Sequence, residues 1–289
     1  MGSKSRVIVL LATHNGEKYL EEQIDSIANQ TGDFQLDIIA SDDGSQDNSI
    51  KILNKKNIKY YEGVRSGACN NFFFLLNNAG NSDYYSFSDQ DDIWQEKKIQ
   101  TAIDLISKVS GPALYIGSVI NQKNGKVIQP DNKKITGFLR NKSQGCTMVF
   151  NKELYELCKP KNATNIIMHD WWLKIVASSV GTIVFDSTPL MTYRIHSSND
   201  TGYPSKARKI LRAVKNLLSF DMLSKQFKQL AQLEVHLEKQ DPDLDALLNA
   251  IKENNIFKRT KVIFELTKSD SKITERVWLA LCSLFTIYD

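Results

Sequence analysis

The hydrophobic positions of the first hundred residues follow two alternating spacings. Short, fully apolar runs at Val7–Leu11 and Leu36–Ala40 are typical of strands that are buried on both faces. The residues between these runs recur instead at the spacing of an amphipathic helix, namely Tyr19, Leu20, Ile24 and Ile27. The alternation continues with a helix through Ile50 and Leu53, a strand at Ile58–Tyr61, a helix over Phe72–Leu76 and a strand at Tyr84–Phe87. Strand–helix units of this length require right-handed crossovers, so the pattern predicts an α/β fold with a parallel sheet between helices.

The pattern changes after about Pro112. The Asn-Gly pair at Asn124 predicts a hairpin between Val119–Asn121 and Lys126–Ile128. Further elements are predicted as strands at Cys146–Phe150, Ile183–Phe185 and Met191–Arg194, and as a helix over Trp171–Ala177. From Lys206 onward the pattern is helical, so a boundary is predicted near Tyr203-Pro204.

Composition places the chain among ordinary globular proteins. Of 289 residues, 42% are hydrophobic and 24% are charged, and no apolar run reaches the length of a membrane span. The first residues lack the length of a signal peptide. The four cysteines show neither zinc-ligand nor disulfide spacing, which favours reduced thiols in a cytoplasmic protein. Residues 204–289 hold 15 basic and 11 acidic side chains, which accounts for the whole net charge of +4.

Polar clusters follow three of the predicted strands. They are Ala12–Gly16, Ser41–Ser45 and Ser88–Asp92. Ligands of open α/β sheets bind at this edge, although Asx-rich turns that merely cap helices are the alternative for the second cluster. In the third cluster Asp89, Asp91 and Asp92 repel one another unless a cation lies among them, and carboxylates suit Mg²⁺ or Mn²⁺. A solvated acidic loop is the alternative.

These blocks resemble the family 2 glycosyltransferases, which are inverting enzymes of the GT-A fold. The similarity runs in order through the three clusters and continues in Gly145–Phe150, His169–Trp172 and Tyr193–His196. The Asp-Gln-Asp-Asp, His-Asp-Trp-Trp and Tyr-Arg-x-His blocks most resemble a rhamnosyltransferase-like branch that builds bacterial surface polysaccharide. The resemblance implies a Rossmann-like, mostly parallel sheet. It implies a catalytic domain over 1–203, with a nucleotide-sugar part to about 117 and an acceptor part over 118–203. Residues 204–289 fall outside the resemblance, and their helical pattern predicts a C-terminal helical extension.

The resemblance also implies the residues of the donor site. Asp43 accepts a hydrogen bond from the imide N–H of the base, and further nucleotide contacts come from Thr13, His14, Asn15, Glu17, Arg65 and Asp89. For Arg65, a plain surface role is the alternative. Asp91 and Asp89 form the Asp-x-Asp motif that holds Mn²⁺ or Mg²⁺. His196 completes the metal shell or contacts the diphosphate.

The implied catalytic base is Asp170, because an ionised carboxylate can remove the proton of the acceptor hydroxyl as it attacks. Capping a helix N-terminus is the alternative role for Asp170. His169, Trp171 and Trp172 are the implied acceptor contacts, although Trp172 could equally belong to the core. The donor is expected to be dTDP-L-rhamnose or a UDP-hexose, and the acceptor a saccharide, in lipid-linked form.

The sequence pattern of the C-terminal residues predicts a binding partner for this part of the chain. Residues 206–220 form an amphipathic pattern with a cationic face, which favours peripheral contact with the inner face of the plasma membrane over packing on the catalytic domain. The apolar run Val277–Tyr288 is too short to span a bilayer and favours packing. Two other function classes compete. The first is a metal-dependent nucleotidyltransferase, but this chain lacks the glycine-rich, basic phosphate loop that such an enzyme needs. The second is a non-catalytic nucleotide- or anion-binding protein, which would not be expected to retain every carboxylate. No nucleic-acid-reading motif is present.

Overall fold

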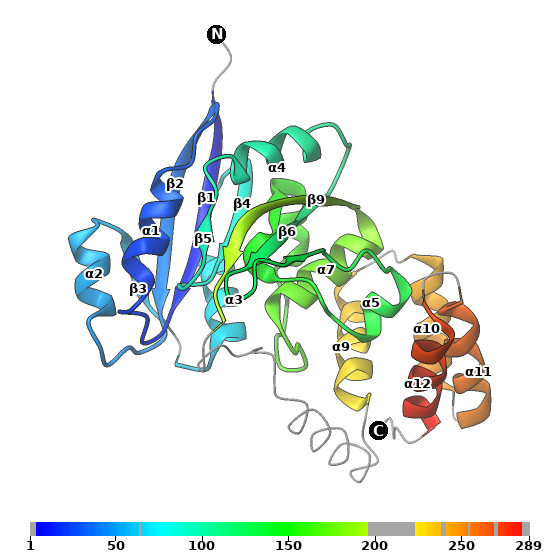
Figure 1. Ribbon diagram of the computed structural model, residues 1–289. Coiled ribbons are helices and arrows are strands. Elements are labelled where there is room, and N and C mark those ends of the chain that lie inside the picture. The colour runs from blue at the N-terminus through cyan, green and yellow to red at the C-terminus, as the bar shows by residue number, and fades with distance from the viewer. Residues whose placement is uncertain are drawn as a thin grey trace.

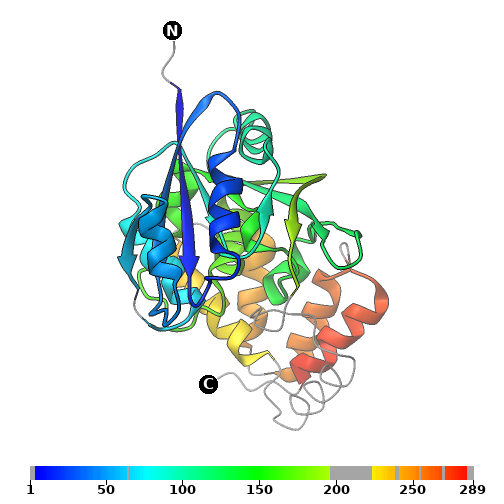
Figure 2. The same ribbon diagram turned by 60° about the vertical axis from the view of Figure 1, so that its left-hand side comes forward.

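The computed structural model describes residues 4–63, 65–195, 223–237, 241–253, 255–268 and 271–284 (Figures 1 and 2). The strands are β1 (Ser5–Thr13), β2 (Phe34–Asp42), β3 (Lys59–Glu62), β4 (Tyr84–Ser88), β5 (Ile93–Trp94), β6 (Ala113–Asn121), β7 (Val127–Ile128), β8 (Val149–Asn151) and β9 (Thr182–Tyr193). The helices up to β9 are α1 (Leu20–Ala28), α2 (Ser49–Lys55), α3 (Ala68–Asn78), α4 (Lys98–Ile106), α5 (Ile135–Leu139), the 3₁₀ turn η1 (Gly145–Thr147), α6 (Lys152–Cys158) and α7 (His169–Val180).

One sheet joins all the described strands. Strands β3, β2, β1 and β4 are parallel neighbours, as the alternating pattern predicts. Beyond β4 the sheet becomes mixed, because β8 runs antiparallel to both β4 and β6, whereas β9 is parallel to β6. The short strand β5 closes the order as an antiparallel neighbour of β9. The predicted α/β class with a mostly parallel central sheet is confirmed.

The two faces of β1 explain why its sequence is apolar from Val7 to Ala12. Successive side chains of a strand point to opposite faces. Leu10 packs with Phe72 of α3 on one face, whereas Val9 packs with Ile99 of α4 on the other. Helix α1 covers the latter face near Leu11. Helices therefore lie on both sides of the sheet, and its polar groups are left to the strand ends.

Two local predictions need correction. The predicted strand over 146–150 is shorter, because Gly145–Thr147 form η1 and β8 begins only at Val149. The two strands predicted at 183–185 and 191–194 are parts of the single strand β9. The polar residues between them continue along β6 through shifts in register near Ser118, so they do not form a turn. The predicted hairpin is confirmed as β6 and β7.

The described C-terminal residues form α9 (Ser224–His236), α10 (Pro242–Lys252), α11 (Ile256–Leu266) and α12 (Ile273–Leu284). Figure 1 shows them together at the end of the molecule opposite β2 and β3, near α5. Their apolar faces share one buried cluster with the sheet, because Leu230, Leu244 and Leu279 belong to the cluster that contains Phe72. The predicted packing of the last helix onto the remainder of the molecule is thus observed.

The predicted amphipathic helix over 206–220 and the predicted boundary near residue 203 lie outside the described residues. Within the part of the chain that the structure describes, every helix is too short or too polar to cross a lipid bilayer. All four cysteines are free thiols, as their spacing predicts.

Candidate active site

The three polar clusters meet at the carboxyl edge of the parallel strands. Thr13 at the end of β1 pairs with Asp42 of β2, and Leu11 pairs with Ser88 of β4. The amide of Asp43 donates to the Thr13 carbonyl at 2.8 Å, which joins the first two loops. Parallel pairing therefore brings together residues that are 77 positions apart at the edge where α/β sheets bind ligands.

Asp43 is positioned by the loop before α3. Its carboxylate is mostly buried and accepts hydrogen bonds from the amides of Ser66 (3.3 Å) and Gly67 (2.9 Å). Arg65 precedes them with a left-handed backbone, at φ 51°, and its exposed side chain lies close to Gly44. The structure thus brings two of the predicted nucleotide contacts, Asp43 and Arg65, to one loop pair.

Gln90 is a site residue that the sequence reasoning missed. Its side-chain oxygen accepts from the Thr13 hydroxyl at 2.7 Å and from the His14 amide at 2.8 Å, and its amide group donates to the His14 carbonyl at 3.0 Å. Gln90 therefore fixes the loop after β1 to the acidic loop after β4. Its position between the aspartates of the Asp-Gln-Asp-Asp block was the only available signal.

Asn15 and Glu17 make contacts within the protein. Asn15 exchanges hydrogen bonds with Ser45 and Gln46, at 2.8 Å each. The Glu17 carboxylate accepts from the backbone and side chain of Asn48, at 3.0 and 2.7 Å, just before α2 begins. In the structure both side chains join the loops after β1 and β2, and neither is shown in contact with a ligand.

The acidic loop forms a crowded, buried group. Ligand atoms of Asp89, Asp92 and Cys146 lie within 4.8 Å of one another. Burial and then the neighbouring charges of Asp91, Asp92 and Asp170 raise the pKa of Asp89 well above its usual range. Burial, followed by repulsion from Asp91, raises the pKa of Asp92 to about 7. Carboxylates that repel one another in this way fit a divalent cation, so the donor set supports a metal site.

The protein places its own cations behind this group. The backbone amide of Arg194 donates to Asp92 at 3.3 Å, and the buried guanidinium forms an ion pair with Glu22. Lys98 is buried against the ring of Trp94, with its nitrogen 3.5 Å from the ring centroid, and burial lowers its pKa to about 7. Sequence reasoning assigned no role to either cation. The predicted metal ligand His196 lies outside the described residues.

Asp170 lies in the first turn of α7. Its carboxylate accepts from the Trp171 amide at 2.6 Å and from the Asn141 side chain at 3.2 Å. Burial raises its pKa to about 6 against the lowering effect of these hydrogen bonds. The helix cap is Met168, so the alternative reading of Asp170 as an N-cap is wrong. The turn η1 joins Asp170 to the acidic loop, because Gly145 packs against Asp170 and the next residue, Cys146, belongs to the group with Asp89 and Asp92.

His169, Trp171 and Trp172 flank Asp170 in the chain, and all three side chains are buried. The ring of His169 is buried and stacked on Phe72, with centroids 3.7 Å apart, and burial lowers its pKa to about 3. Trp171 is also nearly buried and donates from its indole nitrogen to Gly137 at 2.7 Å. Trp172 is fully buried and donates to the Cys158 carbonyl at 2.8 Å. A fully buried ring presents no face to a sugar, so the predicted acceptor contact of Trp172 is corrected to a core role.

A family model named glycosyl transferase family 2 matches residues 8–162, which include the strands β1–β4 and the acidic loop. The chain belongs to glycosyl transferase family 2. This glycosyltransferase is 35% identical over 214 residues to the dTDP-rhamnosyl transferase RfbG of Shigella flexneri, which spans 66% of this chain and 73% of that protein. It is 25% identical over 163 residues to the enzyme WfgD of Escherichia coli, a UDP-Glc:alpha-D-GlcNAc-diphosphoundecaprenol beta-1,3-glucosyltransferase, over 51% of this chain and 61% of that one.

Solved structures have the same fold. Residues 1–349 of TarS from S. aureus, in complex with UDP-GlcNAc, superpose with a TM-score of 0.58 at 14% identity, over 97% of this chain and 88% of that one. The mannosyltransferase PcManGT from Pyrobaculum calidifontis, in complex with GDP-Man and Mn²⁺, gives a TM-score of 0.54 at 16% identity, over 96% and 79%. The predicted GT-A fold of the glycosyltransferase is thereby confirmed.

Gly145 gives a first test of the site's packing. A Cβ at this position would lie 2.8 Å from the Cβ of Asp170, so Gly145→Ala forces α7 and η1 apart. We expect the variant to lose about 1–3 kcal/mol of unfolding free energy in urea titrations, the range for overpacking. Gly137→Ala is the matched control, because its Cβ would meet only Lys174, at an ordinary 3.5 Å. Equal stability of the two variants would contradict the close packing of η1 on Asp170.

Proposed function

We propose that this glycosyltransferase transfers a sugar from a nucleoside diphosphate to a saccharide hydroxyl, with inversion at the anomeric carbon. The supporting observation is geometric: Gly145 packs closely on Asp170, and the next residue, Cys146, lies within 4.8 Å of the carboxylates of Asp89 and Asp92. The similarity to RfbG favours dTDP-L-rhamnose as the donor, and the name of WfgD makes a UDP-hexose the alternative. That name also supports a lipid-linked saccharide acceptor, in the synthesis of bacterial surface polysaccharide.

The nucleotide would lie over the loops after β1 and β2. Asp43 is suited to the base, because its mostly buried carboxylate retains unused lone pairs beside its two backbone donors. Thr13 and His14 are held by Gln90 at the edge of the same loop pair. Arg65 supplies a cation for the base or the phosphates, and Asn15 and Glu17 act by holding the loops in place. In this division, residues to about 117 bind the donor and residues 118–203 bind the acceptor.

Asp91 and Asp89 would hold Mn²⁺ or Mg²⁺, with His196 as a further ligand or a diphosphate contact. Oxygen ligands suit both cations, whereas the thiol of Cys146 is a soft ligand that neither prefers, so we favour Asp91 over Cys146. A bound cation would neutralise the diphosphate as the sugar leaves. The backbone amide of Arg194 holds Asp92, whereas Lys98 donates to the hydroxyl of Ser86 in β4.

Asp170 would act as the base. An ionised Asp170 accepts the proton of the acceptor hydroxyl, and its hydrogen bonds from Trp171 and Asn141 fix the carboxylate in one orientation. A pKa near 6 keeps the group ionised at neutral pH and makes it a stronger base than an exposed aspartate. Trp171 and His169 support this position from the core side, where they are packed.

The donor site can be tested by nucleotide binding. Calorimetry with the diphosphates of uridine, thymidine, guanosine and cytidine should show Mn²⁺-dependent binding of dTDP or UDP that EDTA abolishes. Asp91→Asn should lose the Mn²⁺ dependence, whereas the neighbouring Asp92→Asn should retain it and serves as the matched control. The reverse result would transfer the metal to the Asp89, Asp92 and Cys146 group. Absence of any nucleotide binding would refute the donor site.

The role of Asp170 as the base can be tested by kinetics. Asp170→Asn should lower kcat by about 10²–10⁴, the usual contribution of a positioned general base, and leave dTDP or UDP affinity unchanged. The raised pKa means that the wild-type base is lost as pH falls, so kcat/KM should rise with pH through about 6 and level off above it. Initial rates between pH 5 and 8 measure this profile. A variant with wild-type turnover would exclude Asp170 as the base.

The extension over 204–289 would bring the enzyme to the inner face of the membrane, in keeping with a cytoplasmic protein that acts on lipid-linked acceptors. The cationic face of residues 206–220 supports this contact. Charge reversal of Arg208, Lys209 and Arg212 should abolish co-sedimentation with vesicles that contain anionic lipid, and neutral vesicles are the control. Unchanged sedimentation of the variant would remove the basis for membrane contact.

A further inference from the structure

The segment of residues 131–143, hereafter the acceptor-side segment, lies beside Asp170. Asn141 of this segment donates to the Asp170 carboxylate at 3.2 Å, and its own oxygen accepts from the Ser143 amide at 3.0 Å. Trp171 donates to the carbonyl of Gly137 at 2.7 Å. Lys174, one turn further along α7, donates to the carbonyl of Asp131 at 2.7 Å. The first two turns of α7 therefore hold the segment from one side.

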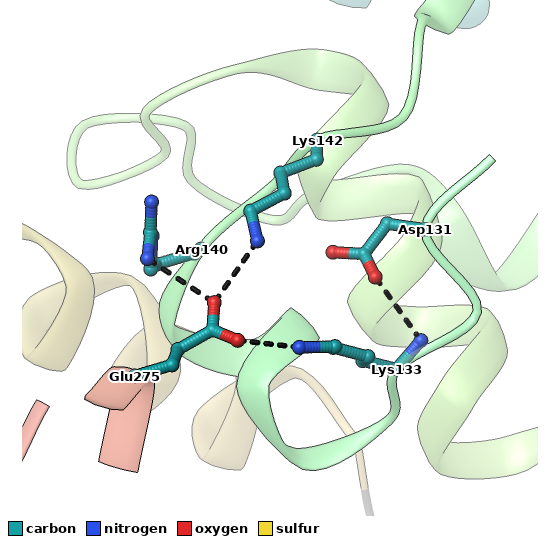
Figure 3. Close-up of polar contacts among 5 residues, drawn as sticks. All are labelled: Asp131, Lys133, Arg140, Lys142 and Glu275. Carbon is teal, nitrogen blue, oxygen red and sulfur yellow. Dashed lines mark hydrogen bonds and ion pairs between the residues drawn. The ribbon is translucent and has the colours of Figure 1, made fainter. Parts of the chain in front are cut away.

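The C-terminal helices hold the same segment from the other side. Glu275 of α12 directs its carboxylate at Lys133, Arg140 and Lys142, with the last two at 3.2 and 2.9 Å (Figure 3). The guanidinium of Arg140 also lies over the ring of Trp278, 4.9 Å from its centroid. Two of the cations, Arg140 and Lys142, immediately flank Asn141 in the chain.

The three basic side chains of this group depend on the single carboxylate of Glu275 for charge compensation. The Glu275 side chain is only 12% exposed, whereas its three partners are 24–44% exposed. Without the carboxylate, three like charges would converge on one point and repel one another. Exposed ion pairs stabilise a protein little. Removal of a mostly buried carboxylate that three cations share is different, because it leaves all three cations without a compensating charge.

We propose that Glu275 is a positioning residue for sugar transfer. It holds the acceptor-side segment so that Asn141 stays hydrogen-bonded to Asp170. The family model ends at residue 162, so this role assigns to the C-terminal helices a part in catalysis that lies outside the matched region. The proposal rests on the proposed function of Asp170 as the base.

The first test needs no substrate. Hydrogen exchange of the acceptor-side segment, followed by mass spectrometry on the full chain, compares wild type with Glu275→Gln. We expect exchange in residues 131–143 to rise roughly tenfold or more, as local opening becomes easier. Glu234→Gln is the matched control, because Glu234 pairs with Lys252 at 2.6 Å between α9 and α10 without a contact to the segment. Exchange in Glu275→Gln that equals the control would overturn the proposal.

The second test measures whether Glu275 acts through Asn141. The rate of nucleotide release from dTDP-rhamnose or UDP-glucose, whichever nucleotide binds, is compared among Glu275→Gln, Asn141→Ala and the double variant. Each single change should lower kcat roughly ten- to hundredfold, as small misplacements of a catalytic group do, with dTDP or UDP affinity unchanged. The double variant should be no slower than the slower single variant, and Glu275→Asp should recover most of the rate. Independent, multiplicative effects would contradict the proposal.

The two tests separate this proposal from the proposed function. If Asp170→Asn is inactive while Glu275→Gln behaves as Glu234→Gln does, the base remains supported and the positioning role is lost. If Asp170→Asn retains full turnover, the base assignment fails whatever Glu275 does, and the exchange measurement still reports whether Glu275 holds the segment.

Discussion

Mutual repulsion among buried carboxylates is the constraint on which the site depends. Asp92 and Asp170 are buried and Asp89 is half-buried, and each has a raised pKa with burial as the leading cause. Such a group destabilises the folded chain unless cations lie close to it. The buried Arg194 and Lys174 partly offset the charge, because they lower the pKa values of Asp92 and Asp170, respectively.

The topology explains why these charges meet at all. Strands β1, β2 and β4 end at the same edge, and each is buried along its C-terminal half, so the first residues that are free of packing demands are those just after each strand. Gln90 then joins the loops after β1 and β4, as Glu17 joins those after β1 and β2. The loops after β1, β2 and β4 thus form one network of contacts at this edge of the sheet.

Much of this could be predicted from the sequence, because strand runs and strand-end clusters are local patterns. The parallel strands β1–β4 and the acidic loop were predicted in this way, whereas Asp170 was singled out by the family resemblance of the His-Asp-Trp-Trp block. Contacts across long separations were not predictable. Cys146 lies in η1 rather than in the expected strand and is grouped with Asp92, and Trp172 is covered by Cys158 of α6 and His236 of α9. Periodicity states which faces are apolar but not which neighbour covers them, so roles such as those of Gln90 and Glu275 required the structure.

The position of Asp170 shows how core packing and surface charge combine. From the inside, His169 is stacked on Phe72 and meets Phe87 edge-on, with centroids 4.8 Å apart, so the start of α7 cannot shift without disturbing the aromatic core beneath the sheet. A histidine with a pKa of about 3 stays neutral there and adds no charge to the carboxylates nearby. From the outside, Asn141 meets Asp170 from a segment held by ions. The inner contact is close aromatic packing, whereas the outer one is a hydrogen bond from a segment that ion pairs to Glu275 hold.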